Sequence, residues 1–223
     1  MNTTATEVQD PSNSPNTRAS SRPTTTRMFK SNFFEFFSRV HPSMPFIVWL
    51  PVIGYMFYRW HARADLAVPS AVGLFFGGLA FWTLTEYVLH RYVFHWVNDT
   101  AWGKRIHFLL HGVHHDYPQD KDRLVMPIGA SAPVAVIAYT LFYFAFGGVR
   151  MGEMFFAGFS VGYLIYDGSH FAIHHFNFKN SWFRSLKRHH MLHHHADHDG
   201  GFGVSSPLWD LVFRSMPNPK RAR

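Results

Sequence analysis

The chain has 223 residues, enough for one domain with a substantial core, and hydrophobic residues make up 47% of it, including 24 Phe. It contains no cysteine, which excludes disulfides, iron–sulfur clusters and thiolate-ligated zinc or haem. The net charge is +7 with His counted as neutral. Because the cations flank apolar segments instead of covering one face, we expect a membrane protein and no nucleic-acid partner.

The two ends of the chain are polar. Residues 1–30 are rich in Thr, Ser, Asn and Pro, and we predict a disordered tail there, with no apolar segment of the kind found in a secretory signal. Residues 216–223 are predicted to form a short basic tail. A Phe-rich segment at residues 33–37 follows the first tail and is predicted to lie at a membrane surface.

Four apolar runs then follow, at residues 45–58, 66–84, 124–149 and 154–166. A bilayer core of about 30 Å requires about 20 apolar residues per helix, so the runs predict about four transmembrane helices in one membrane-embedded domain, residues 31–215. The alternative is a soluble Phe-rich helical bundle. The uncharged stretch of 26 residues at 124–149 disfavours it, because a small soluble fold has little room for such a helix.

The positive charges predict the topology. Residues 1–43 hold five Lys and Arg, the segment between the second and third runs holds five, and the chain after the fourth run holds eight, against three in the other two connections. The positive-inside rule therefore predicts that both termini lie in the cytoplasm. The host membrane would be the endoplasmic reticulum in a eukaryote or the inner membrane in a bacterium.

Histidine is the most informative residue of the chain. There are 17, and ten of them fall into four clusters that follow or separate the apolar runs. The clusters are His90 and His95; His111, His114 and His115; His170 and His174; and His190, His193 and His194. Residues three and four apart share one face of a helix, so we expect each H-x2-H-H cluster to project to one side. The five-residue spacing of the first cluster requires the helix to end or bend within it.

These spacings predict a multinuclear metal centre made of imidazoles, since neutral imidazole is a common ligand of zinc, copper and iron. The predicted topology brings all four clusters to the cytoplasmic face, where a helical cap would hold them. Glu86 lies four residues before His90, and Asp167 three residues before His170. Both carboxylates are predicted to accept an imidazole N–H and to set the orientation of the ring.

The histidine segments resemble the membrane fatty acid hydroxylase superfamily, and their surroundings resemble its fatty acid 2-hydroxylase (sphingolipid alpha-hydroxylase) branch. The segments that carry the resemblance are TEYVLHRYVFH (85–95), HFLLHGVHHDYPQDKDRLVMP (107–127), YDGSHFAIHH (166–175) and LKRHHMLHHHADHDGGFGVSSPLWD (186–210). The resemblance implies that the ten clustered histidines bind two iron ions, which zinc can replace in purified protein. It also implies O2 as co-substrate and a lipid acyl chain, in a fatty acid or ceramide, as the group that is 2-hydroxylated.

Fungal and animal members carry a fused cytochrome b5 domain, and the residues before the first apolar run are too few to form one. We therefore expect a separate electron donor, such as cytochrome b5 or a ferredoxin with its reductase. Two alternatives remain open at this stage. One is a sterol or carotenoid hydroxylase or desaturase with the same histidine spacing. The other is a histidine-rich membrane metal transporter, although transporters place their ligands within the bilayer.

Overall fold

The computed structural model describes residues 25–221, and all regular structure in this part of the chain is helical. The α-helices are α1 (Asn32–Phe37), α2 (Met44–Arg63), α3 (Val68–Leu89), α4 (Ala101–His107), α5 (Val113–Asp116), α6 (Ile128–Ala145), α7 (Val149–His175), α8 (Ser181–His195) and α9 (Leu208–Val212). Two π-helices, η1 (His90–Phe94) and η2 (Phe108–Gly112), and two 3-10 helices, η3 (Lys121–Arg123) and η4 (Pro219–Arg221), complete it. The prediction of an all-α protein is confirmed for the described residues.

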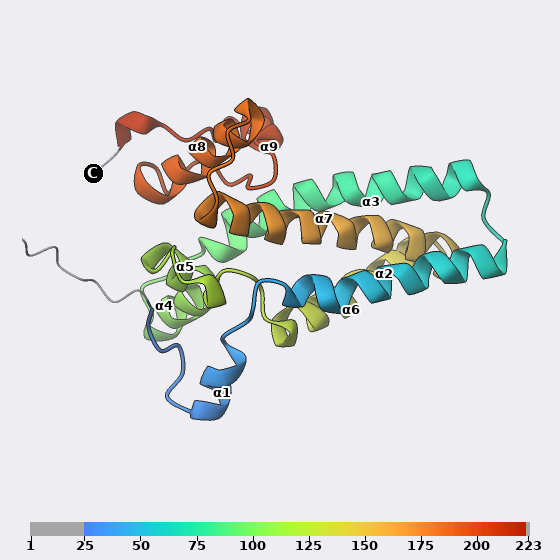
Figure 1. Cartoon of the computed structure of the whole chain (residues 1–223), viewed down its shortest axis with the longest axis horizontal. Coiled ribbons are helices and arrows are strands. Elements are labelled where there is room, and N and C mark those ends of the chain that lie inside the picture. Colours follow the sequence, from blue (N-terminus) through green and yellow to red (C-terminus); the bar gives the residue numbers. More distant parts are fainter. Residues whose placement is uncertain (1–24, 222–223) are drawn as a thin grey trace, which may run out of the picture.

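The long helices α2, α3, α6 and α7 run side by side as a bundle, and α7 packs against each of the other three (Figure 1). Small residues allow the closest of these contacts. A Cβ atom on Gly78 of α3 would collide with the carbonyl of Phe155 on α7, and one on Gly158 would collide with the carbonyl of Phe75. The two backbones therefore touch, as in helix pairs built on small residues within membranes.

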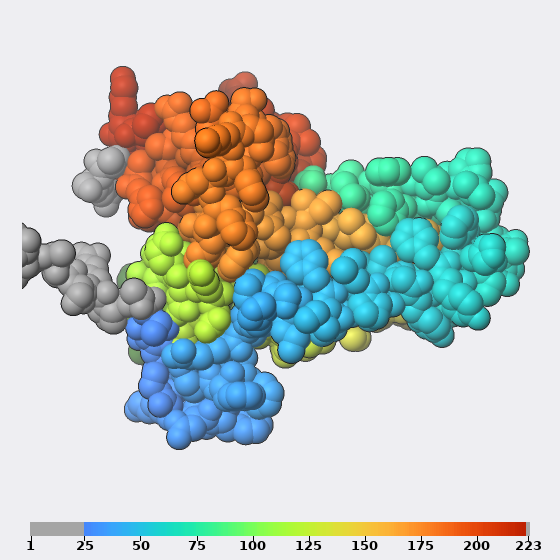
Figure 2. Space-filling view, in the orientation of Figure 1, coloured from blue at the N-terminus to red at the C-terminus, as the bar shows by residue number. Residues whose placement is uncertain are grey.

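The remaining elements and the last turns of α7 gather at one end of the bundle. We call residues 90–127 and 167–221 the head, and residues 25–43 pack against it. The space-filling view shows the same division, with the head as a bulky cluster from which the bundle projects (Figure 2). At the opposite end of the bundle, the buried Glu153 of α7 pairs with Arg59 and Arg63 of α2, at 3.0 and 2.8 Å. These ion pairs fix α2 to α7 at that end.

Two stretches of the described chain, Val68–Phe94 and Lys121–Ala145, are long and apolar enough to cross a membrane. Their helices expose large apolar side chains, among them Phe76 at 59% and Phe144 at 73%. In water such a surface would be unfavourable, so it indicates contact with lipid. The other two predicted spans correspond to α2 and α7, which lie beside them in the bundle.

The helix boundaries differ from those of the apolar runs. Pro51, which interrupts the first run, lies inside α2. The helix α7 continues nine residues past the end of the fourth run at residue 166, because its polar last turns carry buried side chains into the head. Residues 1–24 of the predicted tail lie outside the described part, but residues 25–30 pack against the head, with Met28 buried.

Candidate metal centre

All ten predicted histidines meet within the head, in two groups of five. Within each group the potential ligand nitrogens lie within 4.8 Å of one another. Group one consists of His90, His95, His111, His115 and His193. Group two consists of His114, His170, His174, His190 and His194. The chain therefore forms two compact sets of nitrogen donors, each of which could hold a metal ion.

Each H-x2-H-H cluster divides between the two groups, whereas the sequence predicted that its three rings share one side. Successive helical residues point about 100° apart, so the neighbours His114 and His115 diverge although they follow each other in α5. His115 joins group one and His114 joins group two. The neighbours His193 and His194 on α8 diverge in the same way. One helix thereby supplies ligands to both groups.

The five-residue spacing of His90 and His95 is accommodated by a π-helix. As predicted, the helix ends within the cluster: α3 passes at His90 into the π-helix η1, which ends at Phe94, and the N–H of His95 donates to the carbonyl of His90 at 3.2 Å. A π turn contains more residues than an α turn, so residues five apart return to the same side. A second π-helix, η2, carries His111. Such segments are rare and are found frequently at functional sites.

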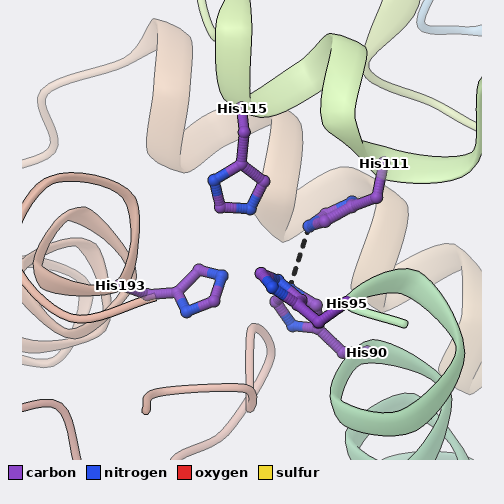
Figure 3. Close-up of side chains that lie close together, drawn as sticks. All are labelled: His90, His95, His111, His115 and His193. Atoms are coloured by element: carbon purple, nitrogen blue, oxygen red, sulfur yellow. Dashed lines mark hydrogen bonds between the residues drawn. The ribbon is translucent and has the colours of Figure 1, made fainter. Parts of the chain in front are cut away.

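In group one the five rings point towards a common centre from three directions (Figure 3). The Nε2 atoms of His90 and His111 lie 3.0 Å apart, and those of His95 and His90 lie 3.2 Å apart. The Nδ1 atom of His90 donates to the carbonyl of Phe202 at 2.6 Å, and Nδ1 of His193 donates to that of Gly200 at 2.8 Å. With the proton on Nδ1, the Nε2 lone pair of each ring faces the centre.

Group two is more deeply enclosed. The Nε2 atom of His114 lies 2.9 Å from that of His170 and 3.0 Å from that of His194, while Nε2 of His190 lies 3.0 Å from that of His174 and 3.1 Å from that of His194. Two nitrogens that each lie about 2.1 Å from one ion are about 3.0 Å apart when they subtend a right angle. The spacing of these nitrogens therefore fits the coordination sphere of a metal ion.

Burial keeps these imidazoles neutral. Burial, together with neighbouring rings such as His198, lowers the pKa of His95 to about 3 and that of His193 to about 4. The pKa values of His111, His114, His115, His190 and His194 are also lowered by burial and by the surrounding imidazoles. A neutral imidazole retains the lone pair that a metal needs, so the rings are ready to bind a metal at neutral pH.

Carboxylates orient the rings of group one indirectly. Glu86 was predicted to accept an imidazole N–H, but its carboxylate accepts from the backbone N–H groups of Val204 and Ser205, at 2.6 and 2.8 Å. Asp210, which the sequence did not single out, accepts from the N–H groups of Phe202 and Gly203. These two buried carboxylates fix the loop at residues 200–205, whose carbonyls accept from His90 and His193. The spacing of residues near Glu86 does not reveal this contact, because the loop is more than 100 residues from Glu86 in sequence.

Asp167 lies fully buried on α7, one turn before His170. No hydrogen bond to an imidazole is formed by Asp167 in the described chain, and its Oδ2 atom has no partner there. The Nδ1 atom of His170 likewise has no partner within residues 25–221. The predicted contact between them is therefore not made, although both groups lie on adjacent turns of one helix.

Histidines outside the two groups have structural contacts. His189 donates through Nε2 to Asp210 at 3.0 Å, which ties α8 to the same carboxylate that fixes the loop. His107 donates through Nδ1 to the carbonyl of Phe94 at 2.8 Å. His195 is exposed and belongs to neither group. The separation of ten clustered histidines from their neighbours is thus reproduced in space.

The comparisons with known proteins agree with this geometry. A family model described as fatty acid hydroxylase matches residues 75–215, which include both groups. The chain belongs to the fatty acid hydroxylase family. The matched segment runs from within α3 into the loop that follows α9, so it comprises most of the bundle and of the head.

Several curated relatives of this family member are named for 2-hydroxylation. The dihydroceramide fatty acyl 2-hydroxylase FAH2 of Arabidopsis thaliana is 39% identical over 88% of this chain and 82% of its own length. The fatty acid 2-hydroxylase of Homo sapiens is 35% identical over 87% of this chain and 57% of its own. A solved structure described as full-length scs7p, with only the hydroxylase domain visible, matches with a TM-score of 0.78 and 36% identity over 84% of this chain and 71% of that one.

Proposed function

We propose that this protein is a non-haem di-iron fatty acid 2-hydroxylase, which adds a hydroxyl group to the carbon next to the carbonyl of a lipid acyl chain. The observation that supports the proposal most directly is the pair of five-histidine groups in the head of a fatty acid hydroxylase. The relatives named above act, by their names, on fatty acids and on the fatty acyl chain of dihydroceramide. One of these lipids would be the substrate.

The reaction takes O2, two electrons and two protons. One oxygen atom enters the new C–O bond and the other leaves as water. When bound, two iron ions would supply the redox chemistry of this step, held by groups one and two. Imidazole also binds zinc well, so zinc would be expected in preparations made without added iron.

The protein's own part is to orient the imidazole rings, to bind the metal ions through them and to enclose the site. The ten rings stay neutral because they are buried, and the loop at residues 200–205 fixes the rings of His90 and His193 through its carbonyls. The fixed proton on Nδ1 keeps each Nε2 available as a ligand. Burial of both groups within the head would also exclude bulk water from the reaction.

An apolar pocket in the half of the bundle nearest the head supports the choice of an acyl substrate. Its wall includes Trp49, Trp82, Phe159 and Tyr163, and Met126 from the segment that enters α6. Aromatic and aliphatic side chains of this kind suit a hydrocarbon chain. In the proposal the acyl tail occupies this pocket and the carbonyl end points towards the head.

The proposal places four helices, α2, α3, α6 and α7, across a membrane, with the head, the metal centre and both termini in the cytoplasm. The excess of Lys and Arg in the segments that form the head supports this orientation. The membrane-embedded domain would be residues 31–215. Electrons would come from a separate protein, either cytochrome b5 or a ferredoxin with its reductase.

Lipid analysis of cells that lack their own 2-hydroxylase tests the proposal. Cells expressing the wild-type chain or His195→Ala should accumulate 2-hydroxy acyl chains, whereas His194→Ala should abolish them while the protein level stays the same. The matched pair differs by one adjacent histidine, inside and outside group two. Modified sterol or carotenoid rings, without 2-hydroxy acyl chains, would assign the protein to the alternative substrate class. Metal uptake into vesicles without any lipid product would contradict an oxygenase.

A further inference from the structure

The short helix α1 exposes its apolar side chains and buries its charged one, the reverse of a helix on the surface of a soluble domain. Its four phenylalanines are exposed, Phe33 at 66%, Phe34 at 58%, Phe36 at 74% and Phe37 at 58%. Its one acidic residue, Glu35, is buried at 8% exposure. Large apolar side chains that point outwards beside a buried charge indicate that the outer face of this helix does not meet water.

Several polar contacts hold α1 in this orientation. The Glu35 carboxylate accepts from the backbone N–H groups of Met28 and Phe29, at 2.9 and 3.0 Å, and from the Arg123 guanidinium at 2.6 Å. Burial alone would raise the pKa of Glu35, but these donors and the Arg123 charge lower it to about 2. Because the carboxylate is fixed on the inner side, the helix cannot turn its phenylalanines inwards.

The segment that carries α1 is joined firmly to the head. The N–H of Val40 donates to the carbonyl of Asp122 at 2.8 Å, and Val40 packs with Leu124 and Val125. We call residues 25–40 the strap. It binds the head beside the segment at residues 120–126, whose last residue lines the apolar pocket.

The position of the strap matches the level at which the head meets the bundle. Figure 1 shows α1 and α9 on opposite sides of the molecule, both beside the head end of the bundle. The helix α9 and its end also expose apolar side chains, Leu208, Leu211, Val212 and Phe213, at 50–60%. Exposed apolar faces therefore lie on two sides of the same end of the bundle.

The charges around the phenylalanines complete the pattern. Lys30 and Arg39 flank α1 and are exposed, while the only carboxylate between them is the buried one. An apolar face bordered by cations is typical of segments that lie in the headgroup region of a membrane with anionic lipids. A protein partner would need a complementary acidic and apolar surface, whereas the exposed bundle helices already indicate lipid beside this face.

We propose that the outer face of the strap inserts into the headgroup–acyl boundary of the membrane leaflet next to the head. The strap then fixes the depth of residues 120–126 relative to the membrane, so that the apolar pocket opens at the level of the acyl chains. The inference rests on the proposed placement of the bundle in a membrane and adds a specific contact to it. Its ligand is a lipid surface that contains anionic headgroups.

A chain without cysteine allows a direct test with single labels. Phe36→Cys, Phe144→Cys and Lys220→Cys are each labelled with an environment-sensitive fluorophore and reconstituted into phosphatidylcholine–phosphatidylglycerol vesicles. The three positions are exposed and lie on the strap, on α6 in the bundle, and on η4 at the far side of the head. Quenching by lipids with a nitroxide near the carbonyl or near the chain end is compared with quenching by aqueous iodide.

The label at residue 36 should emit at shorter wavelength than the label at 220, and carbonyl-level nitroxides should quench it several-fold more strongly than chain-end nitroxides. The label at 144 should show the reverse depth preference, and iodide should quench only the label at 220. If iodide quenches residue 36 while 144 stays deep, the strap inference fails and the membrane placement stands. If neither 36 nor 144 responds to lipid quenchers, the membrane placement itself fails.

Two further outcomes would also overturn the strap inference. Protection of residue 36 that appears only at high protein-to-lipid ratio would indicate a second copy of the chain as the partner. Protection that appears only after a soluble protein is added would indicate a protein partner. Vesicles of phosphatidylcholine alone test the role of charge, because protection should weaken there if Lys30 and Arg39 contact anionic headgroups.

Discussion

Three consecutive histidines at the end of α8 should give three different results when each is changed to alanine. His193 belongs to group one, His194 to group two, and His195 to neither. We expect His195→Ala to retain two ions per chain, and each of the other two variants to weaken one site only. This outcome depends on the division of the groups, which the sequence did not predict.

The magnitude follows from the number of donors. Each group has five imidazoles, so one substitution leaves four nitrogen donors. The affinity of that group for its ion should therefore fall, although the ion need not be lost. Loss of an orienting contact alone reduces metal affinity by about 10–100-fold, so loss of a direct ligand should reduce it by about 100-fold or more, about 2.7 kcal/mol. Dialysis against a chelator of intermediate affinity should then leave about one ion per chain.

Double variants identify which site is emptied. His193→Ala with His115→Ala removes two ligands from group one, so one ion should remain. His193→Ala with His114→Ala removes one ligand from each group, so both ions should be lost under the same chelator. Each double variant deletes two imidazoles, so packing defects are matched. Metal analysis by mass spectrometry measures the result. Equal metal content in the two double variants would refute the division into two groups.

Three other predictions follow from contacts around the site and in the bundle. Asp210→Asn should weaken metal binding by about 10–100-fold and destabilise the fold by about 3 kcal/mol, because it loosens the loop that orients the rings of His90 and His193. Chelator competition and thermal unfolding measure these effects, and unchanged metal affinity would contradict this role of Asp210. Gly158→Ala should lower the free energy of unfolding by about 3 kcal/mol, because the new Cβ forces α3 and α7 apart. Gly73→Ala has nothing within 4 Å of its new Cβ and should leave the melting temperature nearly unchanged. Equal effects of the two variants would refute the close contact. Glu35, with a pKa lowered from 4.5 to about 2, stabilises the fold above pH 4.5, and this contribution is lost as the pH falls from 4.5 to about 2. Glu35→Gln should therefore lower stability at pH 7 and flatten its acid dependence between these values, as urea unfolding at several pH values would show.

The histidine positions could be predicted from the sequence because their spacing is a local property. Residues four apart share one face of a helix, and each pair of clustered histidines with this spacing falls in one group, whereas those three apart fall in different groups. The apolar runs likewise indicated the bundle helices, since the requirement for about 20 apolar residues is also local. The pocket wall and the orienting loop could not be predicted in this way. The loop depends on contacts between α3 and residues 200–210, and the pocket wall depends on the packing of α2, α3, α6 and α7, which are distant from one another in sequence.

The end of α7 shows the same limit from another side. Its last nine residues include one Asp, one Ser and three His, yet they continue the helix and carry His170 and His174 into the head. Asp167, His170 and His174 are buried there, not in contact with water. Hydropathy alone cannot separate the two situations, because it records the side chain and not its neighbours.

The arrangement of ligands has an internal symmetry that explains why the spacings are duplicated. Group one contains the pair His90 and His95. It also contains His111 and His115, the two outer residues of the first H-x2-H-H cluster, and His193, the middle residue of the second. Group two contains the pair His170 and His174 on α7. It also contains His190 and His194, the two outer residues of the second cluster, and His114, the middle residue of the first. Each H-x2-H-H helix therefore gives two ligands to one group and one to the other. Both helices must be in place before either group is complete, so the two metal sites should assemble together.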